Sequence, residues 1–509
     1  MDPIVETSCG RLRGARENGL FKFRGVPYAQ PPLGKLRFRP PLRARPWAGE
    51  LDATQFGPAA PQGADDPLPL RNDITRWSED CLRLNIWTPG LDGKRPVMVW
   101  FHGGAFVRGT ASRPAYDGGV LSLCGDMVVV AVEYRLGALG FLHIDGFSGT
   151  EGAFGTNLGI RDQLSALQWV RDEIAAFGGD SENVTAFGHS AGAVSLGAML
   201  SLPATERIFR RAILQSGPPT AISADAASAV GAVLLEQLGL TKATAEQLRD
   251  IPVETILAAQ PATWKTPGSR PLGVPFAPVI DGDLIARHPL EAVAAGDARE
   301  VAIITGTTAD EVRPYLVLEP DLVSLDEAGL YRRCAEIVPA PATAIGDLIA
   351  VYRDARLRRG AGTTPCDLWL TILGDRFVRC GSIKVAEWQS AAGTPVYSYL
   401  FNWQSPFMNG WLGAFHELEL PFLFGYLDDQ TGTMLTGDRP ERAQLAYRLQ
   451  SAWTAFARDG VPTFEGEAWT RYDRGTRATM VFDVDCSRRD APLDDERRVW
   501  EEIMPLGFI

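Results

Sequence analysis

Short, continuous apolar runs alternate along this chain with longer stretches in which apolar residues recur every three or four positions. The runs at 96–101, 127–132 and 184–187 predict strands that are buried on both faces. Between 160 and 177 the apolar residues are spaced as on one face of a helix, which the following Gly178 and Gly179 end. Further strands are predicted at 82–87, 212–214, 301–305 and 395–401.

Strands that alternate with helices predict the α/β class, with a large, mostly parallel central sheet and helices on both of its faces. The stretches 223–259 and 325–359 are helical in pattern, and we expect them to be insertions that cap the carboxyl edge of the sheet. Prolines crowd residues 25–40, so a long loop is predicted there. We expect residues 1–509 to form one domain that contains both insertions.

Composition narrows the classes of function. The net charge of -12 argues against a nucleic-acid partner or an anionic membrane partner, and no apolar run approaches the length of a membrane span. No apolar segment follows Met1, and the seven cysteines are scattered without C-x-x-C spacing. We therefore expect a cytoplasmic protein with reduced thiols, no disulfide framework and no metal site. The oligomeric state cannot be inferred from these features.

The stretch from 184 to 200 contains a serine in a distinctive context. Gly188-His189-Ser190-Ala191-Gly192 follows a predicted strand and leads directly into an Ala- and Leu-rich helical pattern. A sharp strand–turn–helix connection of this kind raises a serine hydroxyl above the sheet as a nucleophile, and it leaves no room for side chains at the two glycines. The alternative is a chance motif in which Ser190 merely caps a helix.

A serine nucleophile needs a histidine base, and that base needs an acid to orient it. In hydrolases built on such a turn the order along the chain is serine, acid, histidine, which leaves His288 and His416. His288 precedes a proline and predicts a surface turn or a helix start, so His416 is the better candidate. Asp310 and Glu311 follow a predicted strand end, and from their positions either could be the acid.

Acyl transfer also needs backbone N–H groups that face the developing oxyanion. His102-Gly103-Gly104-Ala105 follows a buried strand and has the pattern that supplies them, with Ala191 as a further donor. A plain turn at the glycine pair is the alternative.

Beyond these residues, nine blocks make the chain resemble the type-B carboxylesterase/cholinesterase family of α/β-hydrolases over nearly its whole length. They include FRGVPYAQPPLGKLRF (23–38), SEDCLRLNIWTP (78–89), VMVWFHGGAF (97–106) and YRLGALGF (134–141). The others are NLGIRDQLSALQWV (157–170), FGGDSENVTAFGHSAGA (177–193), RAILQSG (211–217), ADEV (309–312) and AFHELELPFLF (414–424). Among bacterial proteins, the chain resembles the para-nitrobenzyl-esterase-like carboxylesterases.

The resemblance implies a serine carboxylesterase that works through an acyl-enzyme and needs no cofactor. It implies that Ser190 is the nucleophile, His416 the base and Glu311 the orienting acid. The oxyanion donors would be Gly104, Ala105 and Ala191, with Gly103 shaping the loop. Ser216 would support the His–Glu pair, although a simple turn residue is an equal interpretation. The substrate would be a small, apolar ester; the same triad could also cleave amides or carbamates or transfer acyl groups, and a non-catalytic binding protein of the same fold is a further alternative.

Three residues depart from the family pattern. His189 stands where a glutamate is usual, which removes a negative charge beside the nucleophile and weakens the case for a cationic substrate. Secreted relatives pair the cysteine that matches Cys81 with one upstream, but here residues 57–62 have alanine at that place. Glu133 stands where an asparagine is usual. For the pocket we expect contributions from Phe106, His189, Trp403, Phe407, Met408 and Trp411, although aromatic residues are more often plain core.

Overall fold

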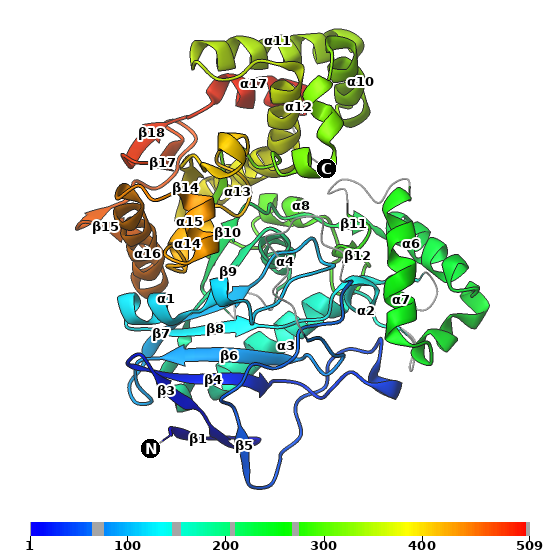
Figure 1. The fold of residues 1–509 in the computed structure, drawn as a ribbon, viewed down its shortest axis with the longest axis vertical. Helices are drawn as coiled ribbons and strands as arrows, with labels where there is room; N and C mark the ends of the chain where they lie inside the picture. Colours follow the sequence, from blue (N-terminus) through cyan, green and yellow to red (C-terminus); the bar gives the residue numbers. More distant parts are fainter. Residues whose placement is uncertain (1, 64–75, 145–153, 204–208, 267–273, 505–509) are drawn as a thin grey trace.

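A computed structural model of the chain describes residues 2–63, 76–144, 154–203, 209–266 and 274–504. Its centre is an 11-stranded sheet with the order β18-β17-β14-β13-β10-β9-β7-β8-β6-β4-β3 (Figure 1). The strands from β17 to β8 in this order run parallel to one another, and the strands beyond them at both edges are antiparallel. The prediction of an α/β protein with a mostly parallel sheet is confirmed for its central part.

The parallel strands, with the exception of β17, which was not predicted, coincide with the predicted apolar runs. They are β7 (Arg95–Phe101), β8 (Val128–Val132), β9 (Gly179–His189), β10 (Arg211–Gln215), β13 (Ala302–Thr308), β14 (Val396–Phe401) and β17 (Ala478–Phe482). The edge strands are β3 (Ala15–Glu17), β4 (Leu20–Pro27), β6 (Arg83–Thr88) and β18 (Ser487–Asp490). A separate small sheet contains β1 (Ile4–Thr7), β2 (Gly10–Arg13) and β5 (Glu50–Asp52).

The proline-rich stretch 25–40 differs in part from the predicted loop. Its first three residues belong to β4, which pairs with β6 through Val26 and Pro27, and Gly34–Leu36 forms a single 3-10 turn. Pro27 is compatible with a strand because it is the last residue of β4, where an edge position tolerates the missing N–H. The remainder is irregular, as the prolines predict.

Helices cover both faces of the sheet, and strand β7 shows why. Val97, Val99 and Phe101 face one core cluster, which also contains residues of helix α3 (Leu158–Glu173). Met98 and Trp100 face a second cluster, which contains residues of helix α16 (Glu441–Asp459). Successive side chains of β7 therefore pack into two different cores, one on each face of the sheet. A strand that is buried on both faces needs a continuous apolar run.

The two predicted insertions are helical. Residues 223–259 contain α6 (Ala224–Gln237), a 3-10 segment (Lys242–Arg249) and α7 (Val253–Ala259), and they lie together at one side of the sheet (Figure 1). Residues 325–359 contain α10 (Glu327–Ile337) and α11 (Ala342–Arg358). These pack with α12 (Pro365–Gly374) and α17 (Asp494–Ile503) around a third core cluster.

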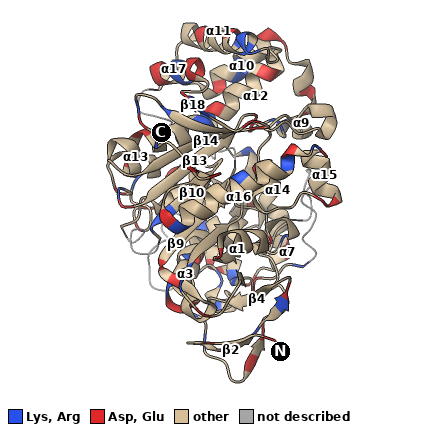
Figure 2. Ribbon diagram, turned by 90° about the vertical axis from the view of Figure 1, so that its left-hand side faces the viewer, with Lys and Arg blue, Asp and Glu red and all other residues tan. Residues whose placement is uncertain are grey.

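Segments with acidic and with basic residues are intermixed over this upper helical group (Figure 2). Here Arg358 of α11 pairs with Asp495 of α17 at 2.5 Å. In the described part of the chain no single helix is long and apolar enough to cross a membrane. Helices α10 and α11 reach that length and composition only together, with a bend of 116° between them. The remaining helices named below are α4 (Ala191–Met199), α13 (Cys380–Ala391) and α14 (Glu419–Leu423).

Candidate active site

Ser190 occupies the turn between β9 and α4. Its backbone angles, φ 54° and ψ -122°, lie in a region that residues with a side chain rarely adopt, at a cost of about 1–3 kcal/mol. The Ser190 N–H donates to the carbonyl oxygen of Gln215, and the Ser190 carbonyl accepts from the N–H of Val194, both at 2.8 Å. Ser190 stays partly exposed although His189 and Ala191 on either side are buried. The turn thus presents a serine at the end of a buried strand.

The two flanking glycines make this turn possible. A Cβ at residue 192 would lie 2.0 Å from the carbonyl oxygen of Phe101, and one at residue 188 would lie 2.7 Å from the carbonyl carbon of Gly192. Both distances are far inside van der Waals contact. The prediction that neither position has room for a side chain is confirmed.

His416 and Glu311 form a close pair. The Nδ1 atom of His416 lies 2.5 Å from Oε2 of Glu311, whose other oxygen accepts the N–H of Thr308 at 2.8 Å. A carboxylate can only accept, so Nδ1 carries the hydrogen and Nε2 is left with the lone pair that a base needs.

The two acids at the end of β13 have different partners. Asp310 accepts the N–H of Ala414 at 3.0 Å and pairs with Arg313 at 3.1 Å, so it fixes the segment that precedes His416. Only Glu311 of the two contacts the imidazole. The structure thus separates the alternatives that the sequence left open.

The imidazole of His416 reaches the serine turn beside His189. The two rings lie with their centroids 4.4 Å apart, and His189 is the residue before Ser190. Within the described residues no hydrogen bond joins the Ser190 hydroxyl to the His416 ring. Such bonds are often long in unliganded hydrolases and tighten when substrate binds.

Two opposing effects act on the pKa of His416. Burial lowers the pKa, but the charge and hydrogen bond of Glu311, together with the charges of Glu417 and Glu419, outweigh it, so the pKa is raised above its ordinary value. The protonated form of the His416 imidazole is therefore stabilised by its surroundings.

The loop after β7 supplies backbone donors beside Ser190. Gly104 and Ala105 have positive φ angles of 124° and 54°, and a Cβ at Gly103 would lie 3.0 Å from the Cβ of Ser190. Among the described residues, the N–H groups of Gly104, Ala105 and Ala191 donate to no protein acceptor. Unused donors around a nucleophile are what an oxyanion hole consists of.

Among the described residues, the Ser216 hydroxyl forms no hydrogen bond with the His–Glu pair. This hydroxyl is buried and forms no hydrogen bond with any described residue, while the backbone N–H of Ser216 donates to the Gly306 carbonyl at 2.9 Å. Its φ of 51° is that of a turn. The geometry favours the interpretation of Ser216 as a turn residue between β10 and the following segment.

The expected pocket residues fall into two groups. Trp403 is 0% exposed and its indole N–H donates to the Thr436 carbonyl at 3.0 Å, and Phe106 is 1% exposed against Phe141. Both side chains pack in the core of this structure, and their part in a substrate pocket stays a prediction.

The other members of the expected set remain accessible or lie at the site. Met408 and Trp411 are 39% and 51% exposed, and Phe407 is partly buried, on the turn that precedes His416. His189 is buried but contacts the His416 ring. Their contribution to a substrate pocket stays a prediction.

Sequence reasoning missed one buried carboxyl near the site. Glu419 is 0% exposed, its Oε1 accepts from Gln215 at 3.4 Å, and burial together with the nearby charge of Glu311 raises its pKa to about 7. The signal was present, because Glu419 lies between Leu418 and Leu420 at the start of α14, whose other residues are apolar.

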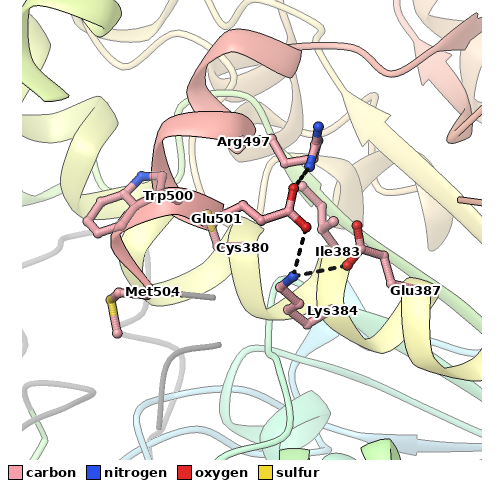
Figure 3. A pocket seen from close by; sticks show the side chains of 8 residues that line it. All are labelled: Cys380, Ile383, Lys384, Glu387, Arg497, Trp500, Glu501 and Met504. Atoms are coloured by element: carbon pink, nitrogen blue, oxygen red, sulfur yellow. Dashed lines mark hydrogen bonds and ion pairs between the residues drawn. The ribbon is translucent and has the colours of Figure 1, made fainter. Parts of the chain in front are cut away.

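A cavity between α13 and α17 lies apart from these residues (Figure 3). The charged groups drawn there are paired: Lys384 with Glu387 at 3.0 Å and with Glu501 at 3.6 Å, and Arg497 with Glu501. Burial raises the pKa of the Cys380 thiol, which keeps it protonated and unreactive. These contacts attach α17 to α13, and we assign the cavity no chemistry.

A doubly covered sheet that ends in a serine turn, beside a histidine–carboxylate pair and free backbone donors, defines the α/β-hydrolase class. The model of the carboxylesterase family matches residues 1–499. The para-nitrobenzyl esterase of Bacillus subtilis (strain 168) is 35% identical over 97% of this chain and 98% of that protein. The phenmedipham hydrolase of Pseudarthrobacter oxydans is 36% identical over 94% of each.

Among solved structures, a Geobacillus stearothermophilus carboxylesterase superposes with a TM-score of 0.86. It is 40% identical, and the match covers 98% of this chain and 99% of that one. The chain therefore belongs to the carboxylesterase family and is a carboxylic ester hydrolase.

Proposed function

We propose that the protein hydrolyses small, uncharged carboxylic esters through an acyl-enzyme on Ser190. The observation that carries this proposal is the His416–Glu311 pair, which leaves Nε2 of the imidazole as a base beside the serine turn. His416 takes the hydroxyl proton as Ser190 Oγ attacks the ester carbonyl, and it gives that proton to the departing alcohol. Water then attacks the acyl-enzyme by the same route and releases the acid.

The N–H groups of Gly104, Ala105 and Ala191 hold the oxyanion in both steps, and no cofactor takes part. Loss of one such donor typically costs about 10²–10³ in rate. Gly103 has no side chain and so lets the loop approach Ser190 closely.

The preference for an uncharged substrate rests on the residue before the nucleophile. That residue is a buried histidine, so this position offers a cationic substrate no charge partner. Phe407, Met408 and Trp411 would supply apolar contacts at the entrance. All seven cysteines are free thiols, which supports a reducing compartment such as the cytoplasm.

A panel of p-nitrophenyl esters of graded acyl length tests this proposal on wild type and Ser190→Ala. We expect turnover that varies with acyl length in wild type, activity near background in Ser190→Ala, and stoichiometric fluorophosphonate labelling of wild type alone. Equal labelling of the two proteins would refute the assignment of Ser190.

A carbamate is a second candidate substrate, favoured by the similarity to the phenmedipham hydrolase. Hydrolysis of an aryl carbamate at a rate comparable to that of the matching ester would support it. Slow, stoichiometric carbamoylation of Ser190 without turnover would exclude it.

A further inference from the structure

Glu133 follows strand β8, where it is buried, and the ester chemistry described above does not use it. Its Oε1 atom accepts from the Thr110 hydroxyl at 2.5 Å, the Ala111 N–H at 2.9 Å and the Ser112 hydroxyl at 3.1 Å. Its Oε2 atom has no hydrogen-bond partner among the described residues and lies 3.8 Å from Nε2 of His102. One carboxyl oxygen is thus saturated, and the other faces an imidazole.

His102 is the first residue of the oxyanion loop, and its ring is tightly held. It stacks on Tyr134 with centroids 4.5 Å apart, and a Cβ at Gly109 would lie 2.5 Å from its Nδ1. Nδ1 lies 2.8 Å from the carbonyl oxygen of Gly103. A carbonyl only accepts, so Nδ1–H donates, and the lone pair of Nε2 faces Glu133.

The carbonyl that accepts from His102 belongs to the same peptide group as the Gly104 N–H. A hydrogen bond to the oxygen of a peptide fixes its plane and polarises its N–H, which becomes a better donor. His102 therefore acts on an oxyanion donor without touching the substrate.

We propose that Glu133 is a positioning residue for the oxyanion hole. As a neutral acid that faces Nε2 of His102, it fixes the tautomer of the imidazole, and that tautomer holds the Gly103–Gly104 peptide in place. This proposal rests on the proposed function, in which the Gly104 N–H binds the oxyanion. When Glu133 loses its proton to water, the carboxylate repels the Nε2 lone pair. The imidazole hydrogen then moves from Nδ1 to Nε2 to donate to the carboxylate, and the Gly103 carbonyl loses its donor.

The surroundings place this change near neutral pH. Burial raises the pKa of Glu133 to about 7 in spite of its hydrogen bonds, and burial lowers the pKa of His102 to about 4, so the extra proton belongs to Glu133. The other titratable or charged groups around the pair are Tyr28, Cys81, Tyr116, Tyr134, Arg135 and Asp162.

The neighbouring groups for which a shift is resolved do not compete with Glu133 in this range. Burial raises the pKa values of Tyr28, Cys81 and Tyr134 well above their ordinary values. Arg135 and Asp162 form a buried ion pair at 2.6 Å.

Glu133→Gln removes the titratable proton and keeps the size and shape of the side chain. The three donors around Oε1 hold the amide oxygen in that position, so the amide NH2 faces His102 and mimics the neutral acid at every pH. The first measurement is kcat/KM for a soluble ester at a series of pH values between about pH 6 and pH 10. The second, over the same pH range, is the affinity for a trifluoromethyl ketone, whose adduct with the serine places an oxyanion in the oxyanion hole.

The rise in activity as His416 loses its proton is common to wild type and Glu133→Gln, so the readout is the ratio of wild type to Glu133→Gln. We expect this ratio, for both quantities, to fall about tenfold in one step to a lower plateau as the pH rises through the neutral range. Glu419→Gln removes the other buried carboxyl whose pKa is about 7, and its ratio to Glu133→Gln should keep the step. A ratio of wild type to Glu133→Gln that does not change across this range would overturn the proposal.

If Glu133→Gln does not fold, His102→Phe provides the test, because it keeps the ring and removes the donor. We expect kcat and ketone affinity to fall together by about tenfold, with KM changed less than twofold. Unchanged ketone affinity would overturn the proposal. Fluorophosphonate labelling of Ser190 in each preparation separates the two claims: its failure in wild type refutes the proposed function, whereas normal labelling with no step in the ratio refutes only the role of Glu133.

Discussion

Glu311→Gln tests the electrostatic core of the site with almost no change of shape. In the wild type, Oε1 of Glu311 accepts the Thr308 N–H and Oε2 accepts the Nδ1–H of His416. The Thr308 N–H will hold the oxygen of a glutamine, so the amide NH2 must face Nδ1. The imidazole would then carry its hydrogen on Nε2, and the base beside Ser190 would be lost.

The expected size of the effect follows from these contacts. A histidine held in the wrong tautomer costs about 10⁴ in kcat in a serine triad. That factor corresponds to about 5.5 kcal/mol of transition-state stabilisation. The acid limb of the residual activity should also move to lower pH, because the charge and hydrogen bond of Glu311 are what raise the pKa of His416.

The assay is kcat/KM against pH for an activated ester, with Glu417→Gln as the matched control. Glu417 is adjacent to His416 in the chain but pairs with Arg113 at 2.7 Å, so its loss should change the rate less than tenfold. In wild type, activity should fall as the pH drops through the raised pKa of His416, because an imidazolium cannot accept the serine proton. A loss below tenfold in Glu311→Gln, or a profile flat down to about pH 4 in wild type, would refute the reasoning.

Two further predictions concern packing. Gly192→Ala would place a methyl group 2.0 Å from the Phe101 carbonyl oxygen, so it should abolish activity and lower the thermal stability of the protein. Its control is Gly346→Ala, which lies on an exposed part of α11 with open space around it and should raise the free energy of unfolding by about 0.5–1 kcal/mol. Calorimetry and an ester hydrolysis assay measure the two effects. Trp403→Ala should lower the free energy of unfolding by about 3–5 kcal/mol in denaturant titrations, without altering the preference for acyl length. Trp411 is half exposed, so Trp411→Ala should change KM with little loss of stability. The reverse pattern would contradict the placement of the two residues.

The central strands were predictable from the sequence because burial on both faces requires a continuous apolar run, as in β7 and β8. The edge strand β18 was not, because its residues, SRRD, are polar and mostly exposed, and it is held by backbone pairing to β17. Pairing of that kind depends on a partner elsewhere in the chain and leaves no periodic signal.

The site shows the same division between local and long-range information. The glycines on either side of Ser190 are required because these two positions have no room for a side chain. The turn could therefore be recognised from five adjacent residues. Asp310 and Glu311 are adjacent, and which of them faces His416 depends on contacts with distant segments, such as the Ala414 N–H that Asp310 accepts. Trp403 was assigned to a pocket because aromatic character alone does not distinguish a pocket wall from a core residue.

The central claim is that Ser190 carries the acyl group during turnover. Rapid acid quenching of the enzyme during hydrolysis of a slowly deacylated ester, followed by peptide mass spectrometry, tests this directly. We expect one acyl group per chain on the peptide that contains Ser190, and none in Ser190→Ala. An acyl group on another residue, or burst kinetics that persist in Ser190→Ala, would contradict it.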